Sequence, residues 1–348
     1  MSAPELSSSF DEARARGRRF ALALAGLVLV TLGVAVLSLF AGRYGLSAAD
    51  TLGALLNPDA KTPAASILWN VRLPRIALAL VAGAGLAASG AAFQALFANP
   101  LASPDTLGVA TGSSFGAVLA ILLGLGSAGI QGCAVVAGLV AIALVMMVSR
   151  VRPGGDQTGS ILMIVLSGMV VGALFTALVS LVKFAADPQD VLPSITFWLM
   201  GSLTGATVTS LLSGLPLLIA GGAILLALSW RLNAAALPPD EAASLGINVR
   251  LLRGAVILAA TLLTASVVSL CGLIGWVGLL VPHAARFLFG AANERVLPAS
   301  MVLGALFLLV IDTAARTMAE SEIPVSILTA LVGAPVFIWL MRRSSGRF

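Results

Sequence analysis

The sequence is poor in the side chains on which most enzyme chemistry depends. It has one histidine, His283, and only two lysines, Lys61 and Lys183. A metal site built from several histidines is therefore excluded. Neither lysine follows a glycine, so there is no P-loop, and the HExxH motif is also absent. We expect no catalytic residues, no metal and no cofactor in this chain, and we expect it not to be an enzyme.

Cysteine is also scarce. Cys133 and Cys271 both lie inside apolar runs and have no CxxC spacing. A disulfide framework needs more cysteines than this, so the sequence predicts two free, buried thiols.

Charged residues make up only 10% of the 348 residues, whereas 59% are hydrophobic. A soluble domain carries roughly a quarter charged residues. The long apolar runs separated by polar gaps predict an all-α, polytopic membrane protein. The net charge of +5 does not indicate nucleic-acid binding, because the basic residues stand at the ends of the runs, where lipid headgroups explain them.

A membrane-spanning helix needs about 20 apolar residues. The sequence predicts about ten spans, at 20–41, 76–97, 107–124, 130–149, 161–182, 211–229, 254–270, 271–290, 297–318 and 324–341. The block 254–290 is best explained by a full span followed by a shorter, broken helix. The segment 195–208 is short and contains Gly and Thr, which predicts an interfacial or re-entrant helix outside the membrane core.

An even number of spans places both termini on one side. Both ends of the chain carry several arginines, and the positive-inside tendency therefore predicts that both lie in the cytoplasm. This orientation puts fourteen basic residues inside and six outside. The six outer residues are Arg43, Lys61, Arg72, Arg75, Lys183 and Arg316.

These patterns divide the chain simply. We expect a cytoplasmic tail at 1–19, one transmembrane domain at 20–341 and a second cytoplasmic tail at 342–348. The 36 glycines include stretches such as GAGLAASGAAF at 83–93. Small residues of this kind allow membrane helices to pack closely.

Six stretches at the ends of the spans are the most distinctive part of the sequence. They are RLPR (72–75), SGAAFQALFANPLASPDTLG (89–108), FWLMGSLTGA (197–206), DEAASLGINV (240–249), GLIGWVGLLVPHAARFLFG (272–290) and EIPVSILTALVGAPVFIWLMRR (322–343). Taken together, in this order, the sequence resembles the FecCD family of permease subunits from ABC importers of iron siderophores, heme and vitamin B12.

The resemblance implies a homodimer of ten-helix subunits in the bacterial inner membrane. A dimeric ATPase on the cytoplasmic side would bind ATP and Mg²⁺, and a periplasmic or lipid-anchored binding protein would deliver the substrate. The substrate would be a ferric siderophore first, and heme or vitamin B12 next. A molybdate-type oxyanion is an alternative.

The resemblance also implies roles for the outer arginines. Arg72, Arg75 and Arg316 would receive acidic residues of the binding protein, for which the planar guanidinium is well suited. Pro74 would start the second span. The alternative for these arginines is snorkelling to the headgroups, or, for Arg316, a local ion pair with Asp312 four residues earlier.

On the cytoplasmic side, the resemblance places a coupling helix for the ATPase within 238–249, with Asp240 as a candidate N-cap and Gly246 in a left-handed conformation at its end. The coupling residues would be Asp240, Glu241, Ala242, Ser244, Leu245 and Gly246. The inner gate would be formed by Asn99, Leu101, Thr158 and Ser160.

Two further positions follow from the same comparison. His283 lies in a VPH segment that the family carries for many substrates, so a structural or interface role is expected rather than heme ligation. Ser326 stands where the family usually has glycine, and only a modest local change is expected there.

The rival from another class is an ion-coupled secondary transporter. Such a protein needs ionisable residues in the membrane, and Asp312 is the only acidic residue well inside a span. A proton relay would need a second group, which the sequence does not supply.

Overall fold

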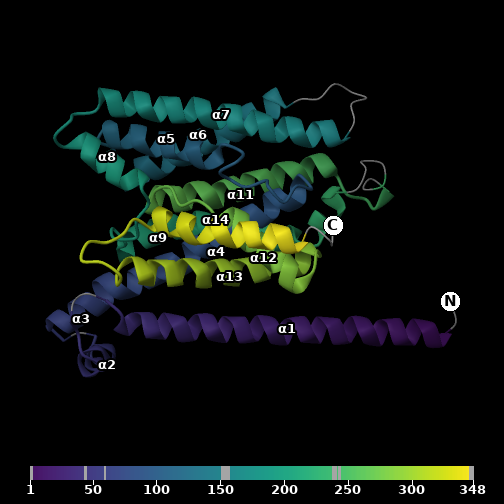
Figure 1. Cartoon of the computed structure of the whole chain (residues 1–348), viewed down its shortest axis with the longest axis horizontal. Helices are drawn as coiled ribbons and strands as arrows, with labels where there is room; N and C mark the ends of the chain where they lie inside the picture. The colour runs from purple at the N-terminus through teal and green to yellow at the C-terminus, as the bar shows by residue number, and fades with distance from the viewer. Residues whose placement is uncertain are drawn as a thin grey trace.

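The computed structural model describes residues 3–42, 45–58, 60–149, 157–236, 241 and 244–344, with side chains omitted at 3–13, 157–162 and 344. These residues form helices, turns and loops but no strands (Figure 1). The α-helices are α1 (Ala3–Phe40), α2 (Ala48–Leu56), α3 (Pro63–Ile67), α4 (Leu73–Leu96), α5 (Val109–Leu122), α6 (Ser127–Val148), α7 (Gln157–Ala185), α8 (Val191–Leu199), α9 (Val208–Leu228), α11 (Val249–Cys271), α12 (Val277–Phe289), α13 (Asn293–Ala315) and α14 (Val325–Ser344). A π-helical turn, η1 (Leu68–Arg72), precedes α4, and a 3₁₀ turn, η2 (Arg231–Ala236), follows α9.

Helices occupy the positions of the predicted spans. Eight helices in the described residues are long and apolar enough to cross a membrane, and α5 and α12 are shorter apolar helices. These ten helices coincide with the ten apolar runs of the sequence. The chain is therefore a multi-pass, all-helical membrane protein.

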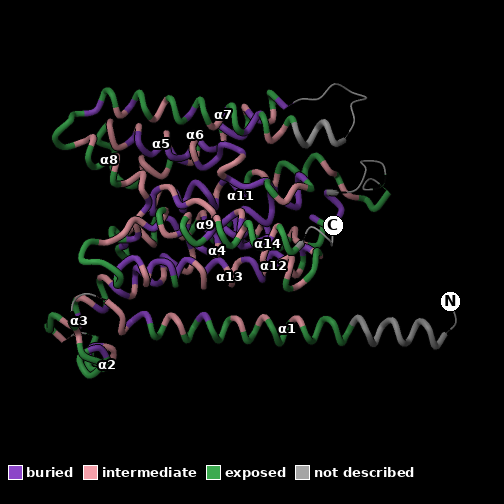
Figure 2. The backbone as a smooth tube through the Cα atoms, in the orientation of Figure 1, coloured by how far each residue is buried: buried purple, intermediate pink, exposed green. Residues whose placement is uncertain are grey.

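The helices run in alternating directions, and α1 begins at the same end of the bundle at which α14 ends (Figure 1). We call this the inner end, following the predicted orientation, and the opposite end, which carries α2 and α3, the outer end. Helix α7 lies along one edge of the bundle and α1 along the other. Figure 2 shows α4 as a largely buried helix at the centre.

Glycines explain how closely α4 packs. A Cβ atom added to Gly83 of α4 would collide with the carbonyl of Gly304 in α13, and one added to Gly90 would collide with the carbonyl of Gly278 in α12. Without a hydrophobic driving force between helices in lipid, such close approach supplies the packing energy. Helix α4 therefore holds α12 and α13 backbone to backbone.

The block 254–290 is broken as predicted. Helix α11 ends at Cys271 and α12 begins at Val277, and both Gly272 and Trp276 between them have φ near 71°. The positive φ of Trp276 is unusual for a bulky residue. The predicted helix at 195–208 is shorter than expected, because α8 ends at Leu199 and the following residues are irregular.

Pro74 lies in the first turn of α4, as predicted, but it does not begin the helical segment. Helical backbone extends back to Pro63, where Thr62 caps the first turn. A proline inside a helix lacks an amide donor and clashes with the preceding turn. Here the wider π turn precedes it, with the amide of Leu73 bonded to the carbonyl of Leu68.

Candidate functional site

Arg75 is the centre of a buried ionic cluster at the outer end. Its Nε and Nη2 atoms donate to the carboxylate of Asp312, at distances of 2.8 to 3.1 Å. Its Nη1 atom donates to both oxygens of Glu322 at 3.0 Å. Glu322 also accepts a hydrogen bond from the hydroxyl of Thr204. Each of the three guanidinium nitrogen atoms of Arg75 thus donates to a carboxylate.

Arg316, which follows the last residue of α13, joins α13 to α1. Its guanidinium donates to the carbonyls of Ser38 and Ala41 and to the hydroxyl of Ser38, at the end of α1. The predicted pair with Asp312 is present but long, with Nε 3.8 Å from Oδ2. Asp312, which has no exposed surface, therefore pairs mainly with Arg75, a partner that the sequence did not indicate.

Arg72 is the third arginine of the cluster and the least satisfied. It is only 3% exposed, and its Nη1 donates to the carbonyl of Leu39. Its Nε and Nη2 atoms are buried without a hydrogen-bond partner among the described residues. Arg316 has one such atom, its Nε. A buried charge without full pairing is unfavourable, so Arg72 is the member of the cluster with the least complete environment.

The ion pairs of the cluster, within the part of the chain that the structure describes, join its arginines to Asp312 and Glu322, so three positive charges stand against these two carboxylates. Burial lowers the pKa of Arg316, and the neighbouring arginines act in the same direction, whereas Asp312 opposes the shift. Because the ordinary pKa of arginine is far above neutrality, Arg316 remains charged.

A pocket of about 700 Å³ opens beside the cluster. It is lined by Gly42, Val71, Arg72, Arg75, Phe197, Thr204, Arg316, Ser321 and Glu322. The structure therefore brings together the three arginines predicted to dock the binding protein, although each is at most 6% exposed.

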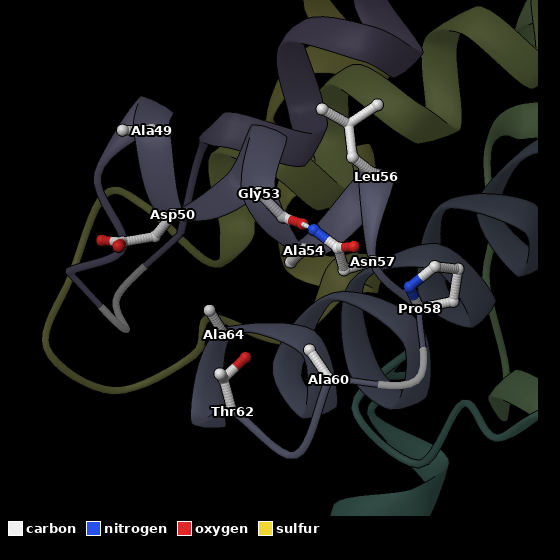
Figure 3. Close-up of a pocket in the computed structure, with 10 residues that line it drawn as sticks. All are labelled: Ala49, Asp50, Gly53, Ala54, Leu56, Asn57, Pro58, Ala60, Thr62 and Ala64. Carbon is white, nitrogen blue, oxygen red and sulfur yellow. Dashed lines mark hydrogen bonds between the residues drawn. The ribbon is translucent and has the colours of Figure 1, made fainter.

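A second outer pocket, of about 690 Å³, lies between α2 and α3 (Figure 3). Its lining includes Asp50, Asn57 and Thr62. Asp50 belongs to a capping box with Ser47, and the hydrogen bonds from Ser47 lower its pKa. The sequence analysis missed this pocket, although the S-x-x-D pattern that begins α2 is a signal for a helix start.

The predicted coupling segment is described only in part. Asp240 and Ala242 lie outside the described residues. Glu241 and Ser244 are helical, Leu245 is 61% exposed, and Gly246 has the predicted left-handed conformation with φ of 73°. A pocket of about 420 Å³ lies at the base of the segment, between the end of α9 and the start of α11.

The predicted gate residues follow α4. Helix α4 ends at Leu96, and the side chain of Asn99 accepts a hydrogen bond from the amide of Leu101, which is 43% exposed. The side chains of Thr158 and Ser160 lie outside the described residues, so their place in a gate with Asn99 and Leu101 stays a prediction.

His283 and Ser326 both make contacts with other helices of the chain. His283 is 2% exposed, and its ring meets the ring of Phe337 edge-on, with centroids 5.8 Å apart. The hydroxyl of Ser326 donates to the carbonyl of Met200, which ties the start of α14 to the end of α8. Among the described residues, no group of three or more His, Cys, Asp or Glu side chains is placed to hold a metal ion.

Both cysteines of the described chain are free, as predicted, but the predicted burial is correct only for Cys271. Cys271 is buried at the end of α11, and Cys133 is half-buried in α6.

Comparison with known proteins identifies relatives over nearly the whole chain. Residues 27–343 match the FecCD transport family. The chain is 43% identical to the molybdate import system permease protein MolB of Haemophilus influenzae, over 90% of this chain and 93% of that protein. It is 34% identical to the vitamin B12 import system permease protein BtuC of Salmonella typhi, over 96% and 98%.

A solved structure agrees with the sequence comparisons. A metal-chelate type ABC transporter in an inward-facing conformation superposes with a TM-score of 0.82 and 41% identity. The match covers 93% of this chain and 99% of that one.

Proposed function

Because this chain belongs to the FecCD transport family and is the permease subunit of an ABC importer, we propose that two copies of it form the translocation path for a metal-containing substrate. A separate ATPase dimer binds at the inner end and hydrolyses ATP with Mg²⁺. A binding protein delivers the substrate at the outer end. The assembly works in the bacterial inner membrane, with both termini of the permease in the cytoplasm.

The observation that supports this proposal is the outer cluster of Arg72, Arg75 and Arg316. The cluster has excess positive charge and lies beside an open pocket, which suits an incoming carboxylate from the binding protein. Snorkelling to headgroups would leave the guanidinium groups at the surface, whereas here they are buried.

For the substrate we propose a metal oxyanion of the molybdate type as the first candidate. The support is the 43% identity to MolB over 90% of the chain. A ferric siderophore is the second candidate, supported by 38% identity over 80% of the chain to a permease named for iron chelatin transport in Helicobacter pylori. Heme and vitamin B12 follow, the latter supported by the similarity to BtuC.

The first experiment is a purification of the tagged chain in detergent from its host, followed by mass spectrometry of the proteins and metals that accompany it. We expect an ATPase with a Walker motif in equal copy number. The complex is then placed in liposomes with its binding protein, and uptake of molybdate and of ferric chelates is compared with and without ATP. Uptake by the chain alone, without ATP, would overturn the importer proposal and favour an ion-coupled transporter.

A second experiment tests docking at the outer cluster. Arg72→Met removes the arginine with unpartnered atoms, and Lys61→Met removes an exposed outer charge that does not line the pocket. We expect Arg72→Met to weaken binding-protein affinity at low salt by more than about tenfold, and Lys61→Met to change it by less than about twofold. Equal effects of the two variants would mean that only the general charge of the outer end matters.

A further inference from the structure

Asn233, in the turn η2, makes two hydrogen bonds to the beginning of α13. Its side-chain Oδ1 accepts the backbone amide of Asn293, at 2.9 Å. Its Nδ2 donates to the carboxylate of Glu294, at 2.6 Å. Asn293 also accepts a hydrogen bond from Arg286 in the last turn of α12. One exposed amide side chain thus joins η2 to the start of α13, close to α12.

Helix α13 depends on this contact because it has no cap of its own. Its N-cap residue is Ala292, which makes no side-chain hydrogen bond. The first amides of a helix have no partner within the helix, and polar side chains usually supply one. Asn233 serves as the cap from a position 60 residues earlier in the sequence.

The two elements that Asn233 joins, η2 and α13, each lead to a predicted functional site. The turn η2 ends at Ala236, immediately before the predicted coupling segment 238–249. Helix α13 runs from Asn293 to the outer cluster, where Asp312 binds Arg75, and it packs through Gly304 against Gly83 of α4. A displacement of η2 would therefore reach a continuous helix that ends at the docking site.

We propose that Asn233 is a positioning residue that transmits movement of the coupling segment to α13. This inference rests on the proposed function, because it assumes an ATPase at the inner end. When the ATPase moves the coupling segment, the two hydrogen bonds of Asn233 carry the start of α13 with it. Without them the coupling segment moves alone.

The test measures substrate transported per ATP hydrolysed, using the complete complex of permease, ATPase and binding protein in liposomes. For Asn233→Ala we expect this ratio to fall by about fivefold or more. A factor of this size corresponds to the loss of one modest interaction. ATP hydrolysis itself should stay within about twofold of the unaltered complex. As a matched control, Ser229→Ala removes a nearby hydroxyl that donates to the carbonyl of Leu226 at the end of α9, and it should leave the ratio unchanged.

Exchanging the hydrogen-bonding groups of Asn233 and Glu294 distinguishes a loss of their hydrogen bond from a general disturbance of the fold. Asn233→Asp keeps the acceptor for Asn293 but places a carboxylate against Glu294, and it should lower the ratio. The double variant Asn233→Asp/Glu294→Gln restores a donor and an acceptor with their positions exchanged, and it should recover most of the ratio.

The outcomes are distinguishable from a failure of the proposed function. If the unaltered chain does not assemble with an ATPase, the importer proposal itself fails. If the complex assembles but Asn233→Ala leaves the ratio unchanged, or the double variant transports as poorly as Asn233→Asp, the role of Asn233 is refuted.

Discussion

Buried arginines set the energetics of the outer end at the scale of single residues. Arg75 and Asp312 form a hydrogen-bonded pair that neutralises both charges, whereas Arg72 is at least as deeply buried and has two nitrogen atoms without a partner among the described residues. Removing one partner of a buried pair is strongly destabilising, but removing a poorly paired charge is not. The same substitution should therefore destabilise the protein at Arg75 but not at Arg72, three positions away.

Arg75→Met should destabilise the protein, because it leaves Asp312 buried without its main partner. We expect a loss of about 3 to 5 kcal/mol in the free energy of unfolding, measured in detergent. The double variant Arg75→Met/Asp312→Asn should recover more than half of that loss, since the orphaned charge is gone. Losses that simply add would show that the two side chains do not stabilise one another.

Arg72→Met should not lower the unfolding temperature. The variant loses one hydrogen bond, worth about 1 kcal/mol, to the carbonyl of Leu39. It also removes a buried charge whose desolvation is unfavourable by several kcal/mol, while the methionine side chain retains apolar contacts like those of the arginine stem. A decrease as large as that of Arg75→Met would contradict this account.

At the scale of helices, the sequence predicted the features that follow from the local order of residues, such as helix breaks and close packing. The length of the 254–290 block indicated the break between α11 and α12, and the glycine-rich stretch 83–93 indicated the close packing of α4. The π turn η1 could not be predicted from the sequence. Pro74 is as typical of a helix start as of a position that follows such a turn.

Contacts between distant residues were also beyond prediction. The sequence identified Arg75 and Asp312 as notable residues but did not pair them, because they are 237 positions apart. Asn233 gave no signal at all, since an asparagine in a polar gap is typical of any loop. Its role as a cap appears only once α9 and α13 are placed side by side.

Packing of α4 gives a prediction at this scale. Gly83→Ala places a methyl group against the backbone of Gly304 and should destabilise the protein by about 1 to 3 kcal/mol or more. Gly132→Ala, on an exposed face of α6 with open space around it, should be neutral or stabilising by up to about 1 kcal/mol. Thermal unfolding of the two variants in the same detergent compares them directly, and similar losses would mean that the approach of α4 to α13 is not tight.

At the scale of the whole molecule, the two ends of the helical bundle carry different features. Helix α1 begins and α14 ends at one end of the bundle, and α2 and α3 lie at the other (Figure 1). The α2–α3 pocket and the arginine cluster belong to that second end. The even number of crossings that the sequence predicted agrees with this arrangement. Which end faces the cytoplasm remains a prediction from the distribution of basic residues.

That orientation can be tested with single thiols. In a Cys133→Ala/Cys271→Ala background, Leu56→Cys places a thiol at an 80% exposed outer position, and Leu245→Cys places one at a 61% exposed inner position. A membrane-impermeant maleimide applied to the periplasmic side should label Leu56→Cys at once. It should label Leu245→Cys only after the membrane is permeabilised, and the reverse pattern would invert the topology.

The distance in sequence between Arg75 and its carboxylates has a consequence for biosynthesis. Asp312 and Glu322 are made 237 and 247 residues after Arg75. At about 5 to 20 residues per second, α4 waits on the order of 10 to 50 seconds in the membrane with Arg75 unneutralised. During that time the guanidinium group must remain near the outer headgroups, where such a charge is tolerated. The burial of Arg75 is thus a late event, completed only when the ribosome has nearly finished the chain.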